Sequence, residues 1–314
     1  MIIDIIGDIH GYADKLIGLL NQLGYTHNGR HFVPPTGHRA LFIGDLIDRG
    51  SQQLETLEIV FAMLDADVAD VVMGNHEYNA LAFATLDPIN PKHYLRSHNQ
   101  IHTNQHAAFL AEIPFGSEAH KYWLQRFYEI PLWLETEYAC FVHACWDVDS
   151  MSVLEPLLTS SSCLTPEALI LTSQEGTVYF DALERVLKGV ETPLPDGIVM
   201  IDKEGTTRSR VRVNWWLDEL NQQTIHHVAR APKSGLAQIP VTALAENIDF
   251  ALKTHKPVFV GHYWMTGEPV PLSSQVICTD YSAAIDSGYL TCYQLDTEQP
   301  LPLDAAHFVQ HRHD

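Results

Sequence analysis

Basic residues are scarce in this chain of 314 residues. It has 19 lysines and arginines against 39 aspartates and glutamates, a formal net charge of −20. Such a surface repels the phosphates of nucleic acids and anionic membranes at long range, so stable nucleic-acid binding is not expected. The charge does not exclude phosphate chemistry, because bound divalent cations can reverse the electrostatic field inside a single cleft.

Long apolar runs and cysteine pairs are also missing. No stretch approaches the ~20 consecutive apolar residues of a membrane-spanning helix, so no membrane contact is expected. The N-terminal apolar run is short, contains Asp4 and does not resemble a signal peptide. The five cysteines are widely spaced and include no C-x-x-C, which is typical of free thiols in a reducing compartment. The sequence therefore predicts a cytoplasmic protein.

Short apolar strands alternate with amphipathic helices in the first part of the chain. The pattern predicts strands at residues 1–7, 39–44 and 68–73, and helices at 12–23 and 51–65, the second with Ser51 as its N-cap. This alternation indicates parallel βαβ units. In such sheets, ligand sites form beyond the carboxyl ends of the strands.

The rest of the chain is less regular. We expect strands at 139–143 and 256–262, and an antiparallel pair at 275–281 and 289–295. Residues 98–130 are predicted to be largely helical. The domain organisation that we expect is a single domain at 1–300, a cap or insertion at 87–135, a variable helical and substrate-shaping region at 150–240, and a fraying tail at 301–314.

Five of the predicted strands end in residues typical of metal ligands. The first three are followed by G-D-I-H-G, G-D-L-I-D-R-G and G-N-H-E, and two later ones end in histidine. The candidate ligands are Asp8, His10, Asp45, Asn75, His143 and His262. The two carboxylate oxygens of Asp45 allow it to bridge two ions. A mixture of carboxylate, amide and imidazole ligands suits divalent Mn, Fe, Zn or Ni.

Three further residues in these motifs suit phosphate chemistry. Two neighbouring ions can polarise a phosphoryl oxygen and deprotonate a bridging water for in-line attack. The leaving alkoxide then needs a proton, which His76 can supply, and Asp48 can orient that imidazole and keep it protonated. Arg49 can clamp the phosphate oxygens with its planar guanidinium.

The three motifs, at 7–11, 44–50 and 74–77, resemble the signature of the calcineurin-like metallophosphoesterases. Their form is similar to that of the phosphoprotein-phosphatase branch, which includes bacterial Ser/Thr phosphatases and symmetrical diadenosine tetraphosphatases. V-H-A (142–144), G-H (261–262) and C-T-D-Y (278–281) extend the resemblance to about residues 2–295. The resemblance implies an α/β (α+β) fold of four layers, with a central β-sandwich flanked by helices and a helical cap insertion.

The resemblance also implies how the site residues divide. One divalent ion would be held by Asp8, His10 and Asp45, and the other by Asp45, Asn75, His143 and His262. Mn²⁺ is the metal that we expect, with Fe, Zn or Ni as alternatives. Asp48 and His76 would form the acid pair, and Arg49 a phosphate clamp.

The family usually has a second phosphate-binding arginine between the last two histidine motifs. Arg208, Arg210 and Arg212 alternate in this region, so a single strand would place all three on one face. The spacing does not choose among them.

Other residues have a structural and a functional interpretation. His102 and His106 lie four apart and could bind zinc on a helix, but an exposed or capping helix face is favoured because further ligands are missing nearby. Trp215 and Trp216 could stack on a nucleotide base, yet core packing is favoured. Cys145 lies near His143 and is expected to pack rather than react.

The sequence therefore predicts a two-metal hydrolase of phosphate monoesters in phosphoproteins or small metabolites. A symmetrical dinucleoside polyphosphate hydrolase, acting on substrates such as diadenosine tetraphosphate, would share the metal chemistry. A phosphatase for nucleic-acid ends is a further alternative. A catalytically dead binding protein would show eroded ligands, and none of the motifs is eroded.

Overall fold

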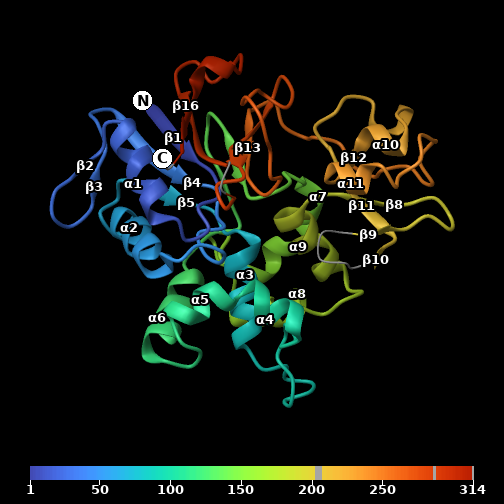
Figure 1. Ribbon diagram of the computed structural model, residues 1–314, viewed down its shortest axis with the longest axis horizontal. Helices are drawn as coiled ribbons and strands as arrows, with labels where there is room; N and C mark the ends of the chain where they lie inside the picture. Colours follow the sequence, from blue (N-terminus) through green and yellow to red (C-terminus); the bar gives the residue numbers. More distant parts are fainter. Residues whose placement is uncertain (202–206, 286–287, 313–314) are drawn as a thin grey trace.

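Two β-sheets form the centre of the protein, whose computed structural model describes residues 1–201, 207–285 and 288–312 (Figure 1). The first sheet has the strand order β15-β16-β1-β4-β5, and β17 pairs with β16. β1, β4 and β5 are parallel, whereas β16 is antiparallel to β1. The strands of this sheet are Ile2–Ile6 (β1), His38–Phe42 (β4), Ala69–Val71 (β5), Asp280–Tyr281 (β15), Tyr289–Asp296 (β16) and Phe308–His311 (β17).

The second sheet has the order β14-β13-β7-β6, in which β7, β13 and β14 are parallel. Its strands are Trp133–Glu135 (β6), Cys140–Val142 (β7), Val258–Val260 (β13) and Val276–Cys278 (β14). Apolar side chains of both sheets meet in one buried cluster, which includes Ile3, Ile5, Leu41, Phe141, Phe259 and Ile277. The predicted β-sandwich is therefore confirmed, as are the predicted strands that precede the five motifs, of which the first three were predicted to be parallel.

Helices cover the outer faces of the sandwich. The apolar sides of α1, α2 and α9 belong to a second buried cluster, which also contains outward-facing strand residues such as Ile6, Phe42 and Val142. The α-helices are Ala13–Gln22 (α1), Gln53–Asp65 (α2), Asn75–Ala84 (α3), Gln100–Gln105 (α4), Ala107–Glu112 (α5), Glu118–Phe127 (α6), Val148–Leu154 (α7), Pro166–Thr172 (α8), Val178–Lys188 (α9), Ile225–Val228 (α10) and Lys233–Leu236 (α11). Short 3-10 helices occupy Glu155–Leu157, Leu220–Gln222 and Ala305–His307.

The start of α2 differs from the prediction. The helix begins at Gln53 rather than after a Ser51 cap, and no side chain of its own N-cap residue accepts a hydrogen bond. The carboxylate of Glu112 does so instead, accepting the backbone N–H groups of Gln53 at 2.9 Å and Leu54 at 3.0 Å. An acidic group from a distant segment thus satisfies the free donors at this helix N-terminus.

Short strands form a lobe at one side of the sandwich, together with α10 and α11 (Figure 1). Its strands are Glu191–Pro193 (β8), Met200–Ile201 (β9), Thr207–Arg208 (β10), Arg210–Val213 (β11) and Ala229–Arg230 (β12). β12-β11-β8 make one sheet and β10-β9 another. The region 150–240 therefore contains short strands as well as helices. A separate hairpin, Thr26–His27 (β2) with Phe32–Val33 (β3), follows α1.

Two predictions near the C-terminus need correction. Residues 275–281 do not form one edge strand, because β14 joins the second sheet and only β15 makes the predicted antiparallel pair with β16 in the first. The tail expected to fray contains β17, which pairs along β16 and packs Phe308 against Tyr281 and Tyr293. Residues 313–314 of that tail lie outside the described residues. Across the described part of the chain, no helix has the length and apolarity needed to cross a membrane.

Candidate metal centre

Five loops that follow parallel strands bring the predicted ligands together. Asp8 and His10 follow β1, Asp45 follows β4, and Asn75 begins α3 after β5. His143 follows β7 and His262 follows β13, so the second sheet contributes as well. Each of the six residues is at most 8% exposed. The carboxyl ends of strands in both sheets thus meet around one buried group of polar side chains.

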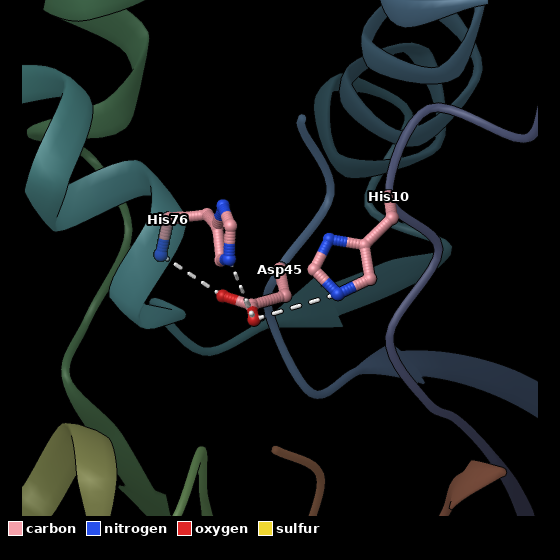
Figure 2. Close-up of side chains that lie close together, drawn as sticks. All are labelled: His10, Asp45 and His76. Carbon is pink, nitrogen blue, oxygen red and sulfur yellow. Dashed lines mark hydrogen bonds and ion pairs between the residues drawn. The ribbon is translucent and has the colours of Figure 1, made fainter. Parts of the chain in front are cut away.

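Asp45 lies at the middle of this group. Its Oδ2 atom is 3.8 Å from Nε2 of His10 and 3.8 Å from Nε2 of His76, and Figure 2 shows the two rings approaching it from different sides. Its Oδ1 atom is 3.4 Å from Nε2 of His143. Two groups of possible ligand atoms, His10–Asp45–His76 and Asp45–His143–His262, each lie within 4.8 Å of one another. One carboxylate is therefore shared between two places that could hold a cation.

The remaining candidate ligands lie beside the second group. Asn75 Oδ1 is 3.2 Å and His262 Nδ1 is 3.3 Å from Nε2 of His143. The carboxylate of Asp8 accepts the backbone N–H of His262, with Oδ2 at 3.0 Å. A Cβ atom at Gly261 would lie 2.1 Å from Asp8 Oδ1, so only glycine allows the loop after β13 to approach this carboxylate.

Unpaired nitrogens at the centre fit metal ions. Nδ1 of His10 faces the carbonyl of Ile47 at 3.0 Å and must donate to it, so Nε2 carries the lone pair. The Nε2 atoms of His10 and His262 are buried and have no hydrogen-bond partner among the residues described. Buried polar atoms without partners are costly, and a histidine whose other nitrogen is fixed by a carbonyl is a typical metal ligand.

The electrostatics of the centre also favour cations. Burial, together with the charges of Asp280 and Asp45, raises the pKa of Asp8 well above its usual value. Burial would raise the pKa of Asp45 too, but the neighbouring His143 and His76 outweigh this effect and hold it well below its usual value. Burial and the nearby His76 lower the pKa of His10 to about 3, which keeps the imidazole neutral and able to bind a metal. A divalent cation would relieve the carboxylate repulsion.

Glu77 is a supporting residue to which sequence reasoning assigned no role. Its buried carboxylate accepts the backbone N–H groups of Asp45 at 2.9 Å, Leu46 at 2.8 Å and Gly74 at 3.0 Å. Asp45 itself has a φ of 49°, a left-handed conformation that needs such support. The glutamate of the G-N-H-E motif thus connects the loop after β4 to the start of α3.

The predicted acid pair is in contact, and a third residue joins it. Nδ1 of His76 is 2.6 Å from Oδ2 of Asp48. The other oxygen, Oδ1, is 2.8 Å from Nδ1 of His106. Of the exposed or capping helix face predicted for His102 and His106, exposure is wrong for His106, which is 5% exposed and stands at the cap position between α4 and α5. The two histidines do not share a face, because α4 ends between them and α5 starts after His106.

The three alternating arginines do not lie on one strand. Arg208 ends β10 and Arg210 begins β11, so the break at Ser209 removes the common face that was predicted. Arg210 donates to the carbonyl of Glu191 at 3.0 Å. Arg212 lies close enough to the centre for its charge to add to burial in lowering the pKa of His262. Its Nε atom is buried without a hydrogen-bond partner in the described part of the chain.

The residues for which packing was favoured do pack. Trp215 is buried, and its Nε1 donates to the Tyr263 hydroxyl at 2.8 Å and to the Ala144 carbonyl at 3.1 Å. Trp216 is buried with its ring against Tyr263. Cys145 is buried, and burial raises the pKa of its thiol well above the usual value, so it is not a reactive thiolate.

Known proteins resemble the part of the chain that carries the first three motifs. Two similar proteins are asymmetrical bis(5'-nucleosyl)-tetraphosphatases named PrpE. The one from Geobacillus sp. (strain WCH70) is 43% identical over 76 residues, which cover 24% of this chain and 31% of that protein. The one from Bacillus subtilis (strain 168) is 33% identical over 97 residues, covering 31% of this chain and 40% of that protein. The chain thus spans less than half the length of these curated relatives.

The fold resembles that of a solved protein serine/threonine phosphatase from Saccharomyces cerevisiae. The TM-score is 0.51 at 13% identity, over 100% of this chain and 80% of that one, so the likeness concerns the fold alone. Residues 1–136 match the model of a family described as calcineurin-like phosphoesterase. This stretch holds Asp8, His10, Asp45 and Asn75 and ends at β6 in the second sheet. Residues 1–136, less than half of the chain, thus resemble the calcineurin-like phosphoesterases.

Proposed function

We propose that this protein is a two-metal phosphoesterase that hydrolyses phosphate monoesters. The observation that carries the proposal is the carboxylate of Asp45, which is shared between two groups of buried ligand atoms. Asp8, in place of His76 of the first group, would hold one ion with His10 and Asp45. Asp45, Asn75, His143 and His262 would hold the other. Mn²⁺ is the metal expected to support activity, since the ligands are oxygen and imidazole nitrogen without thiolate.

The metals and the protein would divide the work of hydrolysis. Bound divalent ions would polarise the phosphoryl group and supply a nucleophile from water at neutral pH. His76 would protonate the leaving oxygen through its Nε2. Its Nδ1 is bound to Asp48, and its Nε2 faces Asp45 at the metal centre. Burial lowers the pKa of His76, but the charges of Asp45 and Asp48 overcome that effect and raise it, which keeps a proton available.

Two arginines would bind the phosphate oxygens from different sides. Arg49 is exposed on the loop after β4, next to the acid pair. Arg212 comes from β11 in the side lobe, and its buried Nε lacks a partner among the described residues. A guanidinium binds phosphate through parallel N–H donors, so this Nε donor, together with the effect of the Arg212 charge on His262, favours Arg212 over the other two arginines of its segment.

A dinucleoside polyphosphate hydrolase is the second candidate. Similarity to the PrpE tetraphosphatases favours this candidate. Those proteins are named as asymmetrical enzymes, whereas the sequence predicted a symmetrical one. Burial of Trp215 and Trp216 removes the base-stacking surface considered for a nucleotide. The monoester function therefore remains the first proposal.

A substrate panel tests the proposal. The protein, purified without metal and reloaded with Mn²⁺, is compared by kcat/KM on p-nitrophenyl phosphate, a phosphopeptide, diadenosine tetraphosphate and a 2′,3′-cyclic nucleotide. We expect the highest value on a monoester. If diadenosine tetraphosphate is preferred, its products decide the second candidate: ATP with AMP shows asymmetrical cleavage, and two ADP show symmetrical cleavage. Binding of two ions without turnover of any of the four substrates would contradict both.

A further inference from the structure

The carboxylate of Asp48 lies between two imidazoles. His76 contacts its Oδ2 at 2.6 Å and His106 contacts its Oδ1 at 2.8 Å, each through Nδ1. All three side chains are buried. His106 lies 58 residues beyond Asp48 and belongs to the α4–α5 segment, outside the motifs that supply the metal ligands. A part of the predicted insertion therefore reaches into the acid pair.

The surroundings of His106 fix which of its nitrogens carries the proton. Its ring stacks on Phe109 with centroids 4.8 Å apart, and it lies against Phe83 at 5.3 Å. Its Nε2 is buried without a hydrogen-bond partner in the residues that are described. A carboxylate only accepts hydrogen bonds, so Nδ1 must be the donor to Asp48. The aromatic packing holds the ring at the angle that aims this donor at Oδ1.

Two donors hold a carboxylate more firmly than one. With His76 alone, the carboxylate plane could rotate and offer either oxygen at a range of angles. With Oδ1 held by His106, Oδ2 is directed at His76. The backbone of Asp48 is also fixed, because its N–H donates to Gln53 Oε1 at 2.7 Å while its φ is 70°. His106 thus removes the last freedom of this side chain.

The two histidines also keep Asp48 ionised. Burial would raise the pKa of Asp48, but the hydrogen bonds from His106 and His76 outweigh burial and lower the pKa to about 2. The bond from His106 is the larger of the two contributions. A permanent negative charge at this position is what a neighbouring imidazolium needs.

We propose that His106 is a positioning residue for the His76–Asp48 acid pair. It orients the Asp48 carboxylate so that the other oxygen meets His76, and thereby sets where His76 delivers its proton. This inference rests on the proposed function, in which His76 protonates the leaving group. His106 itself does not touch the substrate.

Leaving groups of different quality separate this role from a structural one. p-Nitrophenolate needs little protonation as it leaves, whereas phenolate needs more, so a disturbed acid slows phenyl phosphate selectively. His106→Phe keeps a ring beside Phe109 and removes the donor. His106→Asn is the matched variant, since its amide can still donate to Asp48. Each variant is assayed with Mn²⁺ on both substrates, and its metal content per chain is measured.

We expect His106→Phe to lose about 10- to 100-fold in kcat on phenyl phosphate and less than about threefold on p-nitrophenyl phosphate, part of the 10²–10⁴-fold worth of a general acid. KM and metal content should stay near those of the parent, and His106→Asn should recover most of the loss. His76→Ala should show the same selectivity, and the double variant should be no slower than His76→Ala, because both act through one group.

Two results would overturn the inference. One is an equal loss on both substrates in His106→Phe, and the other is an additive loss in the double variant, since each indicates a merely structural residue. Failure of the proposed function looks different. In that case His76→Ala itself would retain metal and lose activity equally on both substrates. His76 would then not be the general acid, whatever the result for His106.

Discussion

The guanidinium of Arg49 lies over the ring of Trp264, with its central carbon 4.8 Å from the ring centroid. The pair joins the loop after β4 in one sheet to the loop after β13 in the other. The backbone N–H of Trp264 donates to Oδ2 of Asp280 at 2.6 Å. The centroid of the Trp264 ring lies 5.9 Å from that of the His10 ring. Trp264 is therefore a fixed platform that holds an otherwise exposed arginine at the edge of the metal centre.

Removing this platform should weaken substrate binding. In Trp264→Ala, Arg49 loses a cation–π contact worth about 1 kcal/mol, so KM for p-nitrophenyl phosphate should rise about fivefold with little change in kcat. Steady-state kinetics with Mn²⁺ measure this. Arg49→Ala should raise KM at least as much, and the double variant should resemble Arg49→Ala. A normal KM in Arg49→Ala combined with a high one in Trp264→Ala would show that the ring acts without the arginine.

Loss of a proposed ligand should remove metal and activity together. In Asp8→Ala, the metal content should fall from about two ions per chain toward one, because a carboxylate beside Asp45 is gone, and kcat should fall by about 10³-fold or more. Elemental analysis after dialysis against Mn²⁺ gives the metal content. Asp196→Ala, an exposed aspartate in the side lobe, is the control and should bind and turn over normally. Full metal content with lost activity in Asp8→Ala would remove it from the ligand set.

Arg212 and Arg210 should differ in their effect on phosphate binding. Arg212 has a buried Nε without a hydrogen-bond partner among the described residues, and its charge lowers the pKa of His262, whereas Arg210 is exposed and donates to Glu191. We expect Arg212→Ala to lower kcat/KM by about 10- to 100-fold, the range for one charged hydrogen-bonding group. Arg210→Ala should stay within about threefold of the parent. Inhibition by inorganic phosphate, measured on both variants, should weaken only for Arg212→Ala. If it weakens only for Arg210→Ala, then Arg210 rather than Arg212 binds the phosphate.

The sequence predicted those features that depend on local patterns. Apolar strands followed by polar motifs placed Asp8, Asp45 and Asn75 at strand ends, because a parallel sheet brings such ends to one edge. Contacts to residues outside the recognised motifs were missed. Glu112 caps α2 and His106 contacts Asp48, but nothing in the sequence beside either residue indicates the group that it will meet.

The errors have the same origin. Alternation suggested one strand for Arg208, Arg210 and Arg212, but β10 and β11 pair with different partners, so the strand is broken between them. Helical spacing of His102 and His106 likewise assumed one uninterrupted helix. Strand pairing decided the first break, whereas α4 ends at Gln105, before His106.

His120 should make the folded state less stable in mild acid. It is buried against Phe115, its Nδ1 accepts the N–H of Gly116 at 3.3 Å, and burial and the nearby His106 lower its pKa to about 4. In the unfolded chain the histidine pKa is about 6.5, so the unfolded state takes up the proton at a higher pH than the folded state. The contribution of His120 to the free energy of unfolding is therefore fully present above pH ~6.5. It decreases as the pH falls toward 4, by at most about 3 kcal/mol. His120→Asn keeps an acceptor for Gly116 but cannot titrate, so its free energy of unfolding in urea should fall less between pH 7.5 and 5 than that of the parent. Equal falls in the two proteins would show that His120 is not the group that titrates.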